Sequence, residues 1–122
     1  MFPDHWKVFL ETHGLLGLSA TIEEDDDLSG VGADLLFLSE AQAIDELSNF
    51  WPGIGVAADG YVPIAACGVG TGDYYYINRN DGPAGPVYRI HHDEVGPDGY
   101  DPDAAVVRVL DAYTRVLGFL DC

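Results

Sequence analysis

The sequence predicts an α+β domain in which helices pack on one face of an antiparallel sheet. Two observations predict this class: segments with helical periodicity lie toward the two ends of the chain, and β-prone runs at hairpin spacing fill its middle. The chain has 122 residues, of which 48% are hydrophobic. We find no internal repeat and no interdomain linker, so residues 1–122 are expected to form one domain with its own core.

The N-terminal half contains two predicted helices. The first covers residues 3–13, because Pro3 suits a first helical turn and Gly14 suits a helix end. A strand over residues 33–38 leads into the second helix, where Ser39 and Gln42 form a capping-box pattern. Its apolar face is expected to continue through Ile44, Leu47, Phe50 and Trp51, up to Pro52-Gly53.

The middle of the chain is predicted to be β-structure. The β-prone runs cover residues 54–58, 61–67, 74–77 and 87–90. Pro63 cannot donate a ladder hydrogen bond, so the second run is expected to be an edge strand or to begin near Pro63. Three consecutive tyrosines at 74–76 alternate between the faces of a strand, so at least one of them leaves the core side.

A third helix is predicted at the end of the chain. Asp101 suits its N-cap, Pro102 its first position and Asp103 its positively polarised first turn. Apolar residues then recur at helical spacing, at Val106, Val109, Leu110, Tyr113, Val116, Leu117 and Leu120.

The charge of the chain restricts its partners. Twenty-one Asp and Glu residues stand against five Lys and Arg, which gives a formal net charge of −16. Phosphate recognition needs a basic face, so this balance argues against direct nucleic-acid binding and against an anionic membrane surface. It permits a basic partner. A composition bias shared by a whole proteome would produce the same charge, and composition alone does not separate the two explanations.

Compartment signals are few. Neither a secretory leader pattern nor an apolar run of membrane-spanning length is visible. Cys67 lies in an apolar run and is expected in the core, and Cys122 is the last residue, so no metal or disulfide spacing is present. We therefore expect a cytoplasmic protein.

No catalytic, metal or cofactor site is predicted. The glycine-rich segment 68–73 leads into a tyrosine-rich strand rather than a helix, which argues against a phosphate-binding loop. His91 and His92 would point to opposite faces of an extended chain, so they are not expected to share a metal ion. Because no nucleophile, base and oxyanion donor can be assigned together, an enzyme is the least favoured class.

Three motifs of the chain resemble those of a known family. Residues 2–14, Phe-Pro-Asp-His-Trp-Lys-Val-Phe-Leu-Glu-Thr-His-Gly, resemble the first helix of the SUKH superfamily of cell-wall-assembly-regulator-like immunity proteins, with His13 where asparagine is usual. Residues 62–65, Val-Pro-Ile-Ala, and 72–77, Gly-Asp-Tyr-Tyr-Tyr-Ile, resemble its central strands. Residues 86–93, Pro-Val-Tyr-Arg-Ile-His-His-Asp, resemble its following strand, whereas residues 15–32 match no motif.

The resemblance implies an α+β fold with an antiparallel or mixed sheet of about five or six strands and helices on one side. Bacterial members are commonly immunity proteins that bind and neutralise a cognate toxin, and many of those toxins are nucleases. Other members are regulatory or scaffold proteins, and this non-enzymatic role is the alternative hypothesis.

An acidic surface that binds a basic toxin is therefore the leading hypothesis. The partner is expected to be a basic nuclease domain bound by a monomer or weak dimer, without cofactors, direct nucleic-acid contact or a membrane. Tyr100 is the expected aromatic anchor. The acids expected to contact the toxin are Glu23, Glu24, Asp25, Asp26, Asp27, Asp73, Asp93, Glu94, Asp98, Asp101 and Asp103.

Overall fold

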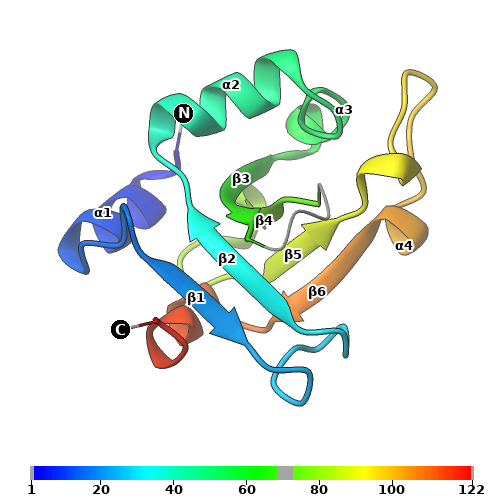
Figure 1. The fold of residues 1–122 in the computed structure, drawn as a ribbon. Coiled ribbons are helices and arrows are strands. Elements are labelled where there is room, and N and C mark those ends of the chain that lie inside the picture. Colours follow the sequence, from blue (N-terminus) through cyan, green and yellow to red (C-terminus); the bar gives the residue numbers. More distant parts are fainter. Residues whose placement is uncertain (1, 69–72, 122) are drawn as a thin grey trace.

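The computed structural model describes residues 2–68 and 73–121, so most of the glycine-rich segment and Cys122 lie outside the described residues. Within these ranges an antiparallel sheet of six strands follows the order of the chain (Figure 1). The strands are β1 (Ser19–Ile22), β2 (Ala33–Phe37), β3 (Tyr61–Cys67), β4 (Tyr75–Asn78), β5 (Val87–Ile90) and β6 (Val106–Leu110). The predicted α+β class with five or six strands is confirmed.

Helical segments begin and end the chain and interrupt the sheet. The α-helices are α1 (Asp4–Thr12), α2 (Glu40–Asn49), α3 (Gly53–Val56) and α4 (Pro102–Ala105). The 3₁₀ turns are η1 (Ala57–Asp59), η2 (Arg79–Asp81), η3 (His92–Glu94) and η4 (Tyr113–Gly118). The capping box predicted at Ser39 and Gln42 is present at the start of α2. None of the helices in the described residues has the length and apolarity to cross a bilayer.

Both faces of the sheet are covered, rather than the single face that the sequence predicted. Tyr75 and Ile77 of β4 belong to the main core, together with Trp6 of α1 and Val116 of η4. Tyr76 points to the opposite face and packs in a second cluster with α3 and α4. Strand alternation places apolar side chains on this outer face of the sheet as well, and the second cluster buries them.

Backbone hydrogen bonds beyond the strand ladders cover the two edges of the curled sheet. The Thr21 N–H of β1 donates to the Phe119 carbonyl at 3.0 Å, which joins the C-terminal segment to one edge. At the other edge, the Leu28 N–H donates to the Val109 carbonyl of β6 at 2.9 Å. The β1–β2 connection that contains Leu28 therefore reaches across to the last strand and satisfies backbone groups that an open edge would expose.

The predicted C-terminal α-helix is wrong for residues 106–110, and residues 113–118 form the 3₁₀ helix η4 rather than a continuous α-helix. Asp101 does cap α4, because its side chain accepts the Asp103 N–H at 3.0 Å. The helix ends at Ala105, however, and residues 106–110 form β6 against β5. The apolar spacing fits a helix, but β-branched Val106, Val107 and Val109 also suit a strand, and pairing with β5 supplies the backbone hydrogen bonds that decide between them.

Other differences are local. Residues 54–58 were expected to be a strand but form α3 and η1, since the chain turns tightly against α2 there. Strand β1 was not predicted at all. Pro63 lies in the central strand β3 rather than at an edge, and the register shifts between Pro63 and Ala65. That irregularity accommodates the missing N–H donor.

A close approach between α2 and α3 depends on Gly53. A Cβ atom at this position would collide with the Glu46 carbonyl oxygen and lie 2.9 Å from the Leu47 Cα. We expect Gly53→Ala to lower the free energy of unfolding by about 1–3 kcal/mol, because the backbone must move to admit the methyl group. Chemical denaturation measures this change. Gly96→Ala is the control, since nothing lies within 4 Å of its Cβ, and a change of less than about 0.5 kcal/mol is expected there.

Candidate functional site

The first acidic segment lies in the β1–β2 connection. Residues 23–26 are exposed, as the sequence predicted. Asp27 is different: it is 4% exposed and does not belong to the acidic surface. Its Oδ1 atom accepts hydrogen bonds from the Ser29 N–H at 2.7 Å and the Ser29 hydroxyl at 2.6 Å. The expectation that Asp27 contacts a partner is therefore wrong, because its carboxylate is used inside the protein.

Arg89 of β5 is the group that holds Asp27. The arginine is 7% exposed, and its Nη2 lies 3.6 Å from Asp27 Oδ2. Its guanidinium also donates to the Ser29 hydroxyl at 2.9 Å and to the Gly32 carbonyl at 2.6 Å. Tyr75, its partner across the strands, lies beneath the guanidinium with 5.4 Å between Cζ and ring centre. One buried cation thus fastens the acidic connection to the sheet.

A cleft of about 460 Å³ opens beside this arginine. It lies where the β1–β2 connection meets the ends of β3 and β5 and the starts of β2 and β4. Its carboxylates come from separate parts of the chain: Glu23, Glu24, Asp34 and Asp73. Cys67, which was expected in the core, is half-buried and lines the cleft too, with its sulfur 3.9 Å from the Tyr75 hydroxyl. The structure thus gathers three of the predicted acids around one opening.

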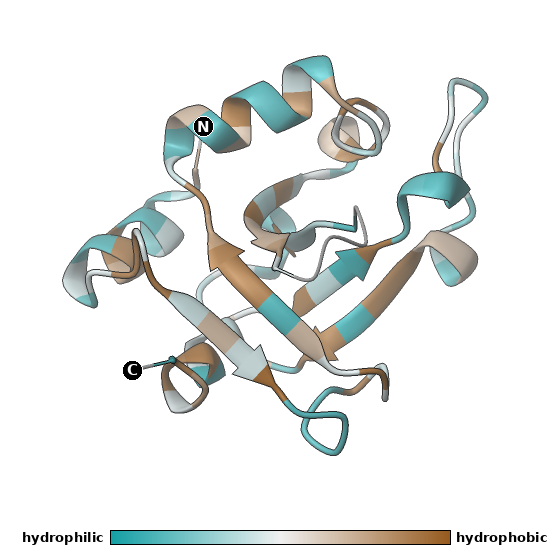
Figure 2. Cartoon of the chain, in the orientation of Figure 1, coloured by the Kyte–Doolittle hydropathy of each residue, from teal (hydrophilic) through white to brown (hydrophobic). Residues whose placement is uncertain are grey.

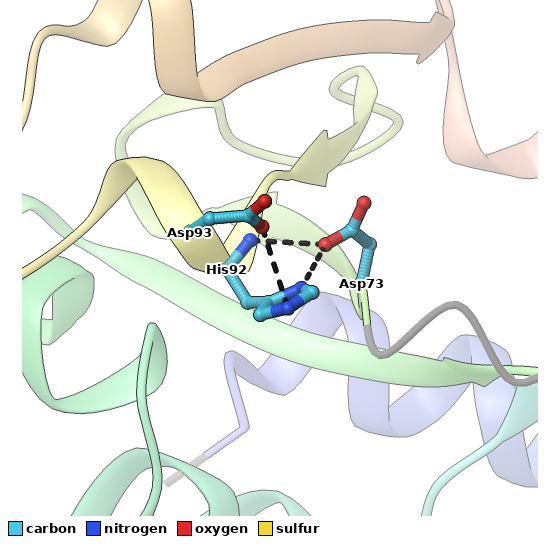
Figure 3. Close-up of side chains that lie close together, drawn as sticks. All are labelled: Asp73, His92 and Asp93. Carbon is cyan, nitrogen blue, oxygen red and sulfur yellow. Dashed lines mark hydrogen bonds and ion pairs between the residues drawn. The ribbon is translucent and has the colours of Figure 1, made fainter.

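Asp73 is held by both neighbouring histidines. His91 Nδ1 lies 3.1 Å from Asp73 Oδ2, whereas His92 contacts Oδ1 with its ring Nδ1 at 2.6 Å and its backbone N–H at 2.9 Å. The expectation that the two side chains diverge is wrong, because His92 begins η3 and strand alternation ends at His91. Figure 3 shows the His92 ring between Asp73 and Asp93, whose carboxylate lies 3.3 Å from Nε2.

These contacts shift the proton affinity of both partners. Partial burial raises the pKa of Asp73, but the hydrogen bonds from His92 and His91 outweigh it and keep that pKa below its ordinary value. The hydrogen bond to Asp73 raises the pKa of His92, and the nearby Asp93 adds to that effect. The folded state therefore favours the charged form of each group beside the other.

Among the described residues, Asp73, His92 and Asp93 lie close enough together to hold a metal ion. One ligand atom each from Asp73, His92 and Asp93 lies within 4.8 Å of the others. His92 and Asp93 are exposed, and hydrogen bonds and ion pairs between the three side chains account for their proximity. The cluster carries no metal assignment, since exposed acids beside a histidine need no ion.

The second acidic segment covers η3, the loop after it and the start of α4. In Figure 2 the hydrophilic tip of the β1–β2 connection lies at the bottom of the view, whereas the hydrophilic η3 lies at the right. Asp93, Glu94, Asp98, Asp101 and Asp103 are exposed, but Asp101 is engaged as the cap of α4. The hydroxyl of the half-buried Tyr100 donates to Asp59, so Tyr100 is anchored in its own fold. Asp73 lies between the two groups of predicted acids, because it lines the cleft with Glu23 and Glu24 and contacts His92, which pairs with Asp93.

Several residues of the cleft escaped the sequence analysis. Arg89, one of five Lys and Arg residues, lies in the β-prone run Val-Tyr-Arg-Ile. Successive side chains of a strand point to opposite faces, so Arg89 and Tyr88 face opposite ways, which is only a weak indication that the arginine points inward. Nothing in the local sequence marks Asp34 or the pairing of Arg89 with Asp27, because 62 positions separate the two charges.

No protein-family model, curated protein or solved structure matches the chain. The resemblance to the SUKH superfamily therefore depends on the three motifs, on their order and on the residues within them.

Replacing Arg89 tests the buried ion pair. We expect Arg89→Met to lower the free energy of unfolding by about 3–5 kcal/mol, because it leaves the Asp27 carboxylate buried without a cation. Chemical denaturation measures the loss, and Arg89→Met with Asp27→Leu should cost less than the sum of the two single changes. Arg115→Met is the matched control: its partner Asp111 lies 3.2 Å away in solvent, where a pair contributes about 0–1 kcal/mol. Equal losses at both arginines would contradict this account.

His92 makes stability depend on pH in a defined direction. A histidine whose pKa is raised by folding stabilises the folded state fully below its unfolded value of 6.5, and this contribution is lost as the pH rises through the raised pKa. Denaturation midpoints should therefore separate wild type from His92→Gln more at about pH 5.5 than at about pH 8.5. His13→Gln is the control, since the contact described for His13 is with the Phe9 ring. A separation independent of pH would contradict the role of Asp73.

Proposed function

We propose that this protein is an immunity protein of the SUKH superfamily that binds and neutralises a cognate toxin with a basic nuclease domain. The observation that carries the proposal is the acid-lined cleft beside a β1–β2 connection with four consecutive exposed carboxylates, residues 23–26. The motif resemblance supplies the class of partner, and the net charge of −16 supports a basic one.

The charge supports neutralisation through a physical route. A nuclease needs a basic groove for its phosphate substrate, and an acidic protein face attracts that groove. Long-range attraction raises the association rate, and the bound protein then excludes nucleic acid from the groove. The buried Arg89–Asp27 contact fixes the C-terminal end of the acidic segment, so less conformational entropy is lost when a partner binds.

Co-expression is the direct test. The gene immediately upstream is expressed with and without this protein in a host that has neither. Survival that requires this protein, together with a complex recovered from those cells, is the expected result. Equal killing with and without it would contradict the proposal and favour the regulatory or scaffold role.

Separate variants of the two acidic segments show which one raises the association rate with the toxin. We expect Glu23→Gln combined with Glu24→Gln, Asp25→Asn and Asp26→Asn to slow association about tenfold at low salt, because electrostatic steering is reduced. Stopped-flow association rates measure it. The control is Asp98→Asn with Asp103→Asn, two exposed acids that leave the Asp101 cap intact. Equal effects per charge removed, or a rate independent of salt, would contradict steering by the β1–β2 connection.

A further inference from the structure

A second pocket, distinct from the acid-lined cleft, lies at the corner between α2 and α3, and Tyr74 of its wall lies between Asp73 and Tyr75 of the cleft. Its volume is about 390 Å³, and it is lined by Gln42, Asp45, Glu46, Phe50, Trp51 and Tyr74. In Figure 1 this corner lies at the top of the molecule, whereas the acidic β1–β2 connection lies at the bottom. Two carboxylates and three aromatic rings therefore surround one opening.

Glu46 is the unusual group in this pocket. The residue as a whole is 8% exposed, and the accessible part includes its carboxylate oxygens. No described residue donates a hydrogen bond to this carboxylate or forms an ion pair with it. Partial burial raises the pKa of Glu46, and the adjacent Asp45 raises it further. The fold thus keeps a negative group at the pocket wall that the chain itself does not neutralise.

The cations of the described chain are engaged or located elsewhere. Lys7 lies 3.6 Å from Glu40, Arg89 lies 3.6 Å from Asp27, and Arg115 lies 3.2 Å from Asp111. Neither Arg79 nor Arg108 lines the pocket. In contrast, Arg89 lines the acid-lined cleft and already offsets part of its charge. The carboxylates of the corner pocket therefore lack a cation from the described chain, whereas those of the cleft have Arg89 beside them.

The aromatic rings are exposed but well positioned. Phe50 is 50% exposed and Trp51 is 42% exposed, which is unusual for adjacent large aromatic residues. The Trp51 ring is seated on α3, since a Cβ atom at Gly55 would lie 2.8 Å from its Cζ3. A ring supported on one side by the fold and exposed elsewhere offers a surface for stacking.

We propose that this pocket binds the guanidinium group of an arginine on a basic protein partner, with the group stacked on Trp51 and paired with Glu46. The inference deepens the proposed function, because the partner is the basic toxin. Arginine fits better than lysine: its planar guanidinium stacks on aromatic faces and donates two parallel hydrogen bonds to a carboxylate. The acids of the β1–β2 connection then attract the partner from a distance, and the corner pocket holds one of its side chains.

The pocket is tested on the intact protein with N-acetyl-arginine methylamide as the probe. Trp51 fluorescence and amide chemical shifts follow the titration, and Trp6 is fully buried, so the accessible indole reports on the corner. We expect a dissociation constant of about 1 mM. The citrulline analogue, which has nearly the same shape without the charge, should bind at least about tenfold more weakly because its hydrogen bonds to a carboxylate are not charge-assisted on the donor side.

Variants separate this site from the general acidity of the chain. Glu46→Gln, which preserves shape, and Trp51→Leu should each weaken arginine binding at least about fivefold. The control Glu24→Gln removes the same charge from the exposed connection and should leave it unchanged. Equal binding of the citrulline analogue, or an equal loss in Glu24→Gln, would overturn the proposal. Protection in co-expression without arginine binding contradicts the pocket alone, and arginine binding without protection contradicts the immunity function alone.

Discussion

The contact between Arg89 and Asp27 joins parts of the molecule that are otherwise far apart in the chain. Arg89 lies in β5, beside Tyr75 of β4, whereas Asp27 lies in the connection between β1 and β2. Because both charges are buried, neither can be satisfied by water, and the connection must close over the end of the sheet. The same connection brings Leu28 to β6, so one ion pair and one backbone hydrogen bond join it to β5 and β6.

The closed connection also determines which of its acidic side chains are buried and which are exposed. With Asp27 directed inward, residues 23–26 remain outside on a segment whose end is fixed, and Glu23 and Glu24 meet Asp73 at one cleft. Asp73 in turn orders the start of η3 through His91 and His92. The acidic groups therefore differ in role: some maintain the fold, some are presented to solvent, and Glu46 lines the pocket between α2 and α3.

Elements with strong local signals could be predicted from the sequence. The helix at 4–12, the capping box at Ser39 and the cap at Asp101 each depend on residues within one turn, so local chemistry suffices. The strand β6 could not be predicted in the same way, because its apolar spacing satisfies both a helix and a strand. Only its pairing with β5 distinguishes them, and that partner lies sixteen or more positions earlier.

Three properties of this protein could be read from the sequence by itself: the α+β fold class, the strong negative charge and the two acidic segments. The tertiary structure alone decided which acids are available, since burial and ion pairing depend on residues distant in the chain. It directed Asp27 toward Arg89, gathered Asp73 with both histidines, and placed Glu46 among the exposed aromatic residues of the α2–α3 corner. The physical reason is that a carboxylate has the same local signature whether it faces water, a cation or an empty pocket, and the fold selects among these environments.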